Sequence, residues 1–352
     1  MTTNSAVNVM FSAPTSHINA ALWERLYKLK LNVSKLDDAN IPCTLRYCPK
    51  SDSATAPYLL HGDSIAYPGE DADYSKGNIR LRGVLKNYNT MQEFKDCDKK
   101  KIILDLTCDI VNHVVSKAAI DDPSLLYPFI LLSYADLKSY RFTYWFCLPC
   151  ILPSVSYTHH VPPVQLKEIS EHSLILNAVY SYCQNLLSLL FYVWKNPSNN
   201  LWCASTLKES WENIYNNDGM VVIIDNGSDG SFTWLLRNLL ILLSYHAPST
   251  VPVNIRVITL RNPMLYTIVD TNELIAHDCS IMMQVPITAQ QYPFTLGSQT
   301  ILSEPAINYV KGYESNERGN IDCYLCVTVL SLYFCLFSQE NLVLARLTYN
   351  QY

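Results

Sequence analysis

Two cysteine pairs have the spacing of a redox dithiol or of half a zinc site. Cys147 and Cys150 enclose leucine and proline, and Cys323 and Cys326 enclose tyrosine and leucine. A reactive dithiol needs its first thiolate at a helix N-terminus, and Pro153 so soon after the first pair disfavours a helix there. A shared four-cysteine zinc site would need pairs closer together in sequence. We therefore keep a standalone redox or zinc-binding α/β protein, using Cys147/Cys150 and Cys323/Cys326, only as a second hypothesis for this chain.

Patterns for nucleotide, calcium and hydrolytic chemistry are incomplete. The ten glycines form no G-x-G and no G-K-S/T, and a phosphate-binding turn needs such glycines so that backbone N–H groups can approach the anion. Residues 225–230 resemble the start of a calcium loop, but Gly227 offers no side-chain ligand and Leu236 stands where glutamate is required. We therefore assign no catalytic, cofactor-binding or metal-binding residue, and expect this chain neither to bind ATP nor to form a thioester.

Composition favours a folded cytoplasmic protein. The chain has 352 residues, 49% of them hydrophobic and 16% charged, with a net charge of -5. An acidic chain is a poor nucleic-acid ligand, so we expect no nucleic-acid partner. The basic run at residues 99–101 follows two aspartates and is interpreted as a solvated helix start. Residues 1–17 lack the pattern of a signal peptide, and the twelve scattered cysteines fit reduced, buried thiols.

The first half of the chain predicts two helices and an aromatic strand. Asn19 can cap a helix over residues 20–29, and Asp98 can open a second. Residues 40–78 are polar and rich in turn formers, and we expect part of them to form a surface loop. A shorter helix is predicted over residues 124–138. After it, Phe142, Tyr144 and Phe146 alternate with other residues as in a core strand, in which we expect Trp145 to be buried.

Helices and strands alternate in the second half. We predict a long helix over residues 164–194, a helix over 234–246 with Trp234 in the core, and three strands. Four prolines between residues 149 and 163 suggest a subdomain boundary. The expected fold is therefore a mixed α/β (α+β) structure of layered mixed sheets with packed helices, in two subdomains at residues 1–153 and 154–319. The three strands are expected at residues 220–225, 253–260 and 281–287.

Residues 320–352 differ from the rest of the chain. Residues 324–337 are uncharged and apolar, but fourteen residues are too few for a membrane span, which needs about twenty. We interpret the segment first as a divergent or aberrant C-terminal sequence, second as a buried strand or hydrophobic tail, and third as a membrane anchor. Association with a membrane is not expected.

The chain contains a series of distinctive sequence phrases. In chain order they are Trp23-Glu24-Arg25-Leu26, Lys30-Leu31-Asn32, Lys35-Leu36-Asp37-Asp38, Asn89-Thr90-Met91-Gln92-Glu93-Phe94-Lys95, Asp98-Lys99-Lys100, Ala135-Asp136-Leu137-Lys138 with Tyr140, Tyr144-Trp145-Phe146-Cys147, Trp234-Leu235-Leu236-Arg237-Asn238-Leu239, Ser280-Ile281-Met282-Met283-Gln284-Val285 and Gly312-Tyr313-Glu314 with Asn316. Together and in this order they resemble the N-terminal domain of the autophagy ubiquitin-like-modifier activating enzyme family (autophagy-related protein 7). The resemblance covers about residues 16–319 and departs from the family at Leu235, where proline is usual.

This resemblance implies a module of the autophagy conjugation pathway. In the whole enzyme, ATP is used to adenylate the ubiquitin-like modifiers, autophagy-related proteins 8 and 12, which then form an enzyme thioester. The N-terminal domain recruits the conjugating enzymes, autophagy-related proteins 3 and 10. All matched phrases belong to that domain, so none of the twelve cysteines inherits the thioester role. We expect a recruiting domain without the adenylating half, whose contact residues the phrases do not identify.

Overall fold

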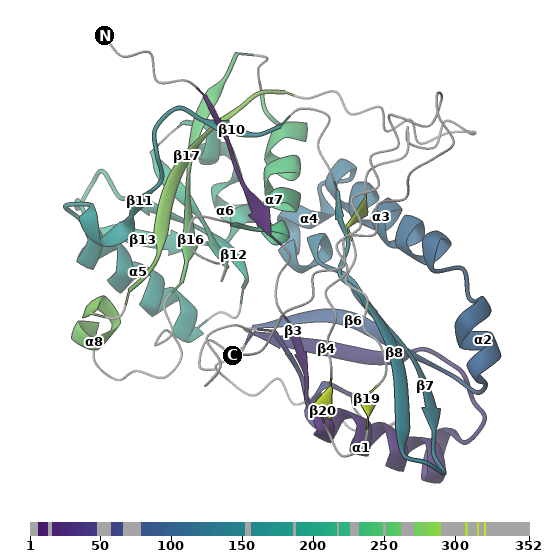
Figure 1. Ribbon diagram of the computed structural model, residues 1–352. Coiled ribbons are helices and arrows are strands. Elements are labelled where there is room, and N and C mark those ends of the chain that lie inside the picture. Colours follow the sequence, from purple (N-terminus) through teal and green to yellow (C-terminus); the bar gives the residue numbers. More distant parts are fainter. Residues whose placement is uncertain are drawn as a thin grey trace.

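The computed structural model contains two six-stranded sheets with helices packed on them and between them (Figure 1). The predicted mixed α/β class, with layered mixed sheets and packed helices, is confirmed. The boundaries proposed for the two subdomains stay predictions. The structure describes residues 6–12, 16–47, 58–65, 79–151, 156–185, 188–216, 218–225, 232–248, 251–261, 271–276 and 278–289, and three short strands at 307–308, 315–316 and 320–321.

The first sheet has the strand order β3-β5-β4-β6-β7-β8. Strands β6 and β7 are parallel and are joined by a crossover through three helices, whereas β7 and β8 form an antiparallel hairpin. The predicted aromatic strand is β8, and both of its faces are buried over most of its length. The strands are β3 (Ser16–Ile18), β4 (Ile41–Tyr47), β5 (Tyr58–Leu60), β6 (Arg80–Tyr88), β7 (Phe129–Asp136) and β8 (Arg141–Cys147).

Helices cover both faces of this sheet. The predicted cap of the first helix is confirmed, because Asn19 Oδ1 accepts a hydrogen bond of 2.9 Å from the N–H of Ala21. Trp23 of this helix stacks on Phe142 of β8 at 5.0 Å between ring centroids. The helices are α1 (Ala20–Leu29), which continues as the π-helix η1 (Lys30–Ser34), α2 (Met91–Asp96), α3 (Lys99–Val115) and α4 (Ala118–Asp121), with 3-10 turns η2 (Gly62–Ser64) and η3 (Pro123–Leu126).

The second sheet has the strand order β11-β17-β16-β14-β12-β13. Its central strands β14 and β16 are parallel, and all six residues of β14 are buried. A strand covered on both faces has an unbroken apolar sequence, as β14 does. The strands are β11 (Val164–Gln165), β12 (Leu190–Lys195), β13 (Trp202–Ser205), β14 (Gly219–Ile224), β16 (Val253–Leu260) and β17 (Ile281–Ile287), and the three predicted strands correspond to β14, β16 and β17.

The remaining elements join the two sheets or cover the second one. The N-terminal strands pair with the second half of the chain, since β1 pairs with β10 and β2 with β15. The helices are α5 (His172–Asn185), α6 (Leu207–Ser210), α7 (Trp234–Tyr245), α8 (Thr271–Ala276), η4 (Leu166–Glu168) and η5 (Trp211–Asn216). The short strands are β1 (Val7–Asn8), β2 (Phe11–Ser12), β9 (Cys150–Ile151), β10 (Thr158–His159), β15 (Phe232–Thr233), β18 (Ile307–Asn308), β19 (Ser315–Asn316) and β20 (Asn320–Ile321).

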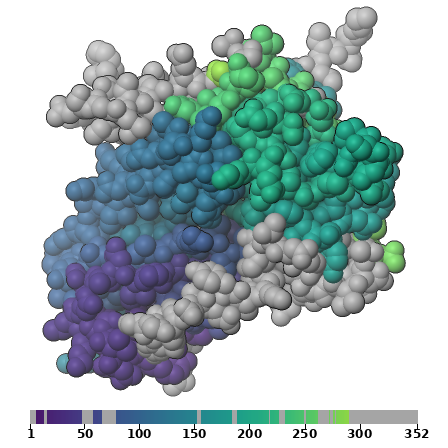
Figure 2. Space-filling view, turned by 180° about the vertical axis from the view of Figure 1, so that it is seen from behind, coloured from purple at the N-terminus to yellow at the C-terminus, as the bar shows by residue number. Residues whose placement is uncertain are grey.

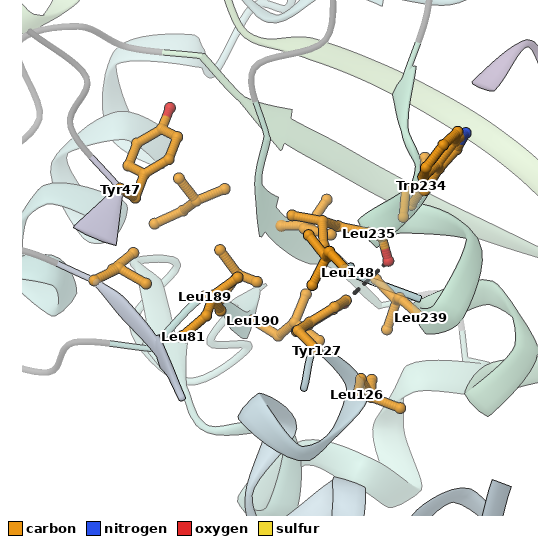
Figure 3. Packing of buried hydrophobic residues seen from close by; sticks show 14 of the residues in the cluster. Tyr47, Leu81, Leu126, Tyr127, Leu148, Leu189, Leu190, Trp234, Leu235 and Leu239 are labelled. Carbon is orange, nitrogen blue, oxygen red and sulfur yellow. Dashed lines mark hydrogen bonds between the residues drawn. The ribbon is translucent and has the colours of Figure 1, made fainter. Parts of the chain in front are cut away.

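We call the part of the chain that carries the first sheet the first half, and the part that carries the second sheet the second half. Helix α7 lies where these halves meet and is buried on almost every side, as its nearly uniform apolar sequence requires. Tyr127 donates a 3.1 Å hydrogen bond to the carbonyl of Leu235 in α7, and Figure 3 shows its ring among leucines from both halves. Asn238 donates to the carbonyls of Leu126 and Pro149 and accepts from the N–H of Ile151. One hydrophobic cluster therefore runs through both halves, which lie against each other in Figure 2.

Two predicted helices are wrong. Residues 124–138 form the end of η3 and then β7. The prediction failed because a short apolar run in a buried strand cannot be told from a buried helix by its periodicity. The helix predicted over residues 164–194 is shorter, since β11 and η4 precede α5 and residues 190–195 form β12. Residues 40–78 contain β4, β5 and η2, while residues 48–57 and 66–78 of the expected surface loop, and residues 324–337, lie outside the described residues.

Candidate functional site

The cysteines of the first C-x-x-C pair lie in different surroundings. Cys147 belongs to a small cluster with Trp145, whereas the Cys150 thiol donates to the carbonyl of Trp234 at 3.4 Å. Both side chains are buried, and burial raises the pKa of the Cys147 thiol and raises that of Cys150 to about 12. A thiol with a raised pKa is a poor nucleophile at neutral pH, so this pair lacks the setting of a reactive dithiol.

In the described part of the chain, no group of three or more His, Cys, Asp or Glu side chains is placed so that it could bind a metal ion. The second cysteine pair, Cys323 and Cys326, lies outside the described residues. None of the helices in the described ranges is both long and apolar enough to cross a membrane.

A buried histidine, aspartate and serine form a structural link in the second half. His172 Nε2 lies 3.0 Å from Asp278 Oδ2, and the Ser280 hydroxyl donates to Asp278 Oδ1 at 2.6 Å. A hydrolytic triad needs the serine hydroxyl on the imidazole, whereas here it contacts the carboxylate. The link connects the first residue of α5 to the segment that precedes β17.

A hollow of about 270 Å³ lies between the halves, where β6 and the α4–η3 segment face β12 and α6. Its wall includes Leu81, Leu189 and Leu190, which Figure 3 shows together. At the rim, Asp122 lies 3.8 Å from a guanidinium nitrogen of Arg82. The lining contains two arginines, Arg80 and Arg82, and two aspartates, Asp121 and Asp122, so this hollow has no net charge that would select a ligand.

A second, separate hydrophobic cluster lies between helices α2 and α3 and the sheet. Its buried residues come from both helices and from β7 and β8, with Trp145 only 1% exposed. Leu132 stands beside Trp145 in the strand register and beside Lys86 of β6. We call the outer side of this cluster the α2–α3 surface; it consists of Lys86, Tyr88, Met91, Lys95, Lys99, Lys101, Ile102 and Tyr134.

Aromatic rings and lysines are interleaved on the α2–α3 surface. Tyr88 and Phe94 meet edge to face at 6.2 Å between ring centroids. Lys99 Nζ lies 4.9 Å from the centre of the Phe94 ring and donates a 2.9 Å hydrogen bond to the Phe94 carbonyl. Lys86 Nζ lies 5.3 Å from the centre of the Tyr88 ring. These cation–π contacts keep ammonium groups on an apolar surface.

The carboxylates near these lysines have partners in the helix ends. Glu93 accepts from the N–H of Thr90 at 3.0 Å in a capping box, and Asp98 accepts from the N–H of Lys101 at 2.9 Å. Asp96 accepts from the Gln92 side chain. In the parts of the chain that the structure describes, the side chains of Lys95 and Lys101 form no ion pair and are exposed. The surface therefore carries both lysines and carboxylates, with the carboxylates fixed at the helix ends.

Residues 9–325 match the family model described as "Ubiquitin-like modifier-activating enzyme ATG7 N-terminus". The chain belongs to this family. Its curated relatives include the ATG7 enzyme of Gallus gallus, 28% identical over an alignment of 256 residues, with 67% of this chain and 34% of the relative covered. The ATG7 enzyme of Mus musculus is 33% identical over 175 residues, covering 47% of this chain and 24% of the relative. The alignments thus span about a third or less of these relatives.

Solved structures show the same fold at low sequence identity. The Kluyveromyces marxianus Atg7NTD has a TM-score of 0.58 and 20% identity, with 81% of this chain and 92% of that chain covered. The Kluyveromyces marxianus Atg7NTD–Atg10 complex gives a TM-score of 0.56 at 20% identity, covering 82% and 90%. The resemblance to an autophagy-related protein 7 N-terminal domain that the sequence phrases suggested is confirmed.

The family phrases occupy both core and surface positions. Trp145 and Trp234 are 1% and 4% exposed, so the prediction that both lie in the core is confirmed. The phrase at residues 89–95 forms the turn before α2 and α2 itself, and the basic run at 99–101 begins α3. Sequence reasoning missed Lys86 and Tyr88, although their spacing of two along a strand places both on one face of the sheet. Residues 312–314 lie outside the described ranges.

Proposed function

We propose that this chain recruits the conjugating enzymes of the autophagy pathway, autophagy-related proteins 3 and 10. The observation that carries the proposal is membership of the ATG7 N-terminal family together with the same fold as Atg7NTD, which has been solved in complex with Atg10. The chain acts by protein–protein interaction, in the cytoplasm. Its contribution is to hold the conjugating enzyme close to the modifier thioester, which accelerates transfer by proximity and orientation.

Activation of the modifiers belongs to the rest of the enzyme in this proposal. Adenylation of autophagy-related proteins 8 and 12 with ATP, and the thioester that follows, are assigned to an adenylating half that the matched family segment does not include. Neither activity is assigned to the described residues, and no nucleic acid takes part. Recruitment by this chain therefore needs no nucleotide.

Calorimetric titration of the purified chain with autophagy-related proteins 3 and 10 from the same source tests this function. We expect saturable binding of moderate affinity without ATP, because a flexible partner segment loses entropy when it becomes ordered. A conjugating enzyme of the ubiquitin pathway serves as the negative control. We also expect removal of the segment after Gly319 to leave binding unchanged. Absence of binding to both proteins, with a chain that circular dichroism shows to be folded, would reject the recruiting function.

A further inference from the structure

We propose that the N-terminal strap, residues 7–12, is a detachable latch that closes over the N-terminal end of helix α7 and opens as a unit while both halves stay folded. The strap consists of β1, β2 and the two residues between them. In Figure 1 it is the purple strand that crosses the second half beside β10 and α7. Opening of the latch is a movement within the domain and is independent of the recruiting function.

The strap is held by two short ladders outside the six-stranded sheets. β1 pairs with β10 through two residue pairs, and β2 pairs with β15 through two more. The N–H of Val9 also donates to the carbonyl of Tyr157 at 2.8 Å. From the other side, the N–H of Phe232 donates to the carbonyl of Met10 at 3.0 Å. Among the strands that the structure describes, release of the strap therefore breaks no pairing within either large sheet.

The side chains of the strap are only partly covered. Val9 is 7% exposed, and Phe11 is half-buried against the main hydrophobic cluster. Val7 and Met10, by contrast, are 51% and 65% exposed. Phe11 is the anchor, since the guanidinium carbon of Arg237 in α7 lies 4.5 Å from the centre of its ring. A segment that buries so little apolar surface opens more readily than the core beneath it.

Both halves keep their own contacts when the strap is released. In the second half, β14 lies between β12 and β16, and all six of its residues are buried. Asn238 of α7 still donates to the carbonyls of Leu126 and Pro149, which precede β7 and follow β8. The strap itself leads to β3, which pairs with β5 in the first sheet. Its release therefore removes one tie between the halves and leaves these hydrogen bonds in place.

Native-state hydrogen exchange on the full chain tests the latch. The amides of Val9 and Phe232 both lose their acceptors when the strap opens. We expect them to share one protection factor, about tenfold or more below that of the amides of β14. Low urea should change this protection factor little, because opening exposes little surface, and should lower that of β14 steeply. Equal protection of the strap and β14, or unequal protection of Val9 and Phe232, would overturn the proposal.

Three variants of the full chain separate opening of the strap from global unfolding. Phe11→Ala should lower the protection of Val9 and Phe232 about threefold or more, whereas Met10→Ala, at an exposed position, should change it less than about twofold. Val222→Ala in β14 removes a buried contact that the open state keeps. It should therefore lower the protection of β14 and leave that of the strap unchanged. A parallel loss at the strap in Val222→Ala would show that the strap opens only when the whole protein unfolds.

Discussion

Single side chains connect the layers of this protein. Trp145 of β8 lies in the hydrophobic cluster between the first sheet and helices α2 and α3. Asn238 forms hydrogen bonds with three backbone groups of segments distant in sequence. His246, at the end of α7, reaches the carbonyl of Val114 at the end of α3. Each of these contacts involves a buried or half-buried group, so its loss should be measurable in stability.

Replacing Trp145 with alanine should lower the free energy of unfolding by about 3–5 kcal/mol, because the large buried ring leaves a cavity. The control is Leu36→Ala, whose side chain is 81% exposed; its effect should stay within about 0.5 kcal/mol. Urea denaturation followed by circular dichroism measures both. Equal stability of the two variants would mean that the ring does not contribute to the core.

Stability should fall as the pH is lowered from 7.5 to 5.5, in part through His246. Burial lowers the pKa of His246 below its usual 6.5, with Lys117 acting in the same direction against the hydrogen bond to Val114. The unfolded chain therefore binds the proton first, so the contribution is complete above pH 6.5 and is lost as the pH falls. His246→Gln, whose amide can still donate to Val114, should flatten this dependence. Among the histidines that the structure describes, His61 also has a lowered pKa and should account for part of the remaining dependence. An unchanged slope in urea titrations of His246→Gln would contradict the assignment.

At the scale of elements, each sheet contains a parallel pair of strands that a crossover of helices joins. β6 pairs with β7 through a crossover of helices, and β14 pairs with β16 through α7. Parallel strands with helical crossovers bury both faces. This burial explains why periodicity misassigned residues 124–138, whose apolar run continues across β7. The apolar run of residues 190–195, predicted as the end of a helix, is β12; this strand is antiparallel to both neighbours, and its first four residues are buried, so its sequence does not alternate either.

Close approach of β6 to β7 depends on Gly83. A Cβ atom at Gly83 would lie 2.4 Å from the carbonyl oxygen of Phe129 and 2.5 Å from its ring. Gly83→Ala should therefore destabilise the protein by about 1–3 kcal/mol, as overpacking does in cores. Gly62→Ala is the matched control, because its nearest contact would be 3.1 Å from Ala21. A smaller loss for Gly83→Ala than for Gly62→Ala, by urea denaturation, would contradict this packing.

At the scale of the whole molecule, the two halves share one core. The main hydrophobic cluster contains residues of both sheets, and the N-terminal strands β1 and β2 pair with strands of the second half. Helix α7 packs between them and carries the Asn238 hydrogen bonds to the first half. Separation of the halves would expose this helix and leave buried backbone groups without partners.

We therefore predict a single cooperative unfolding transition. Tryptophan fluorescence, with Trp23 in the first half and Trp211 in the second, and circular dichroism should give coincident urea curves. Asn238→Ala should shift the midpoint to lower urea, whereas Asn112→Ala, at an exposed position of α3, should not. Two separate transitions in the unchanged chain would show that the halves unfold independently.

The sequence by itself determined the family, the fold class and the elements with a local signature. Asn19 and Asp98 as caps, the amphipathic α3 and the strands at residues 253–260 and 281–287 were predictable because their signals lie within a few neighbouring residues. The burial of Trp145 followed from the aromatic alternation around it. The sequence also shows that the glycines lack a phosphate-binding pattern.

Only the tertiary structure decided which apolar runs became strands and which side chains form the α2–α3 surface. Lys86 and Tyr88 lie on β6 and meet α2 and α3 through the packing of helices on a sheet, a relation between segments that local spacing does not encode. Likewise, the lysines of residues 99–101 look like any solvated helix start in sequence. Only the fold places Lys99 over the Phe94 ring and the nearby carboxylates at the helix ends.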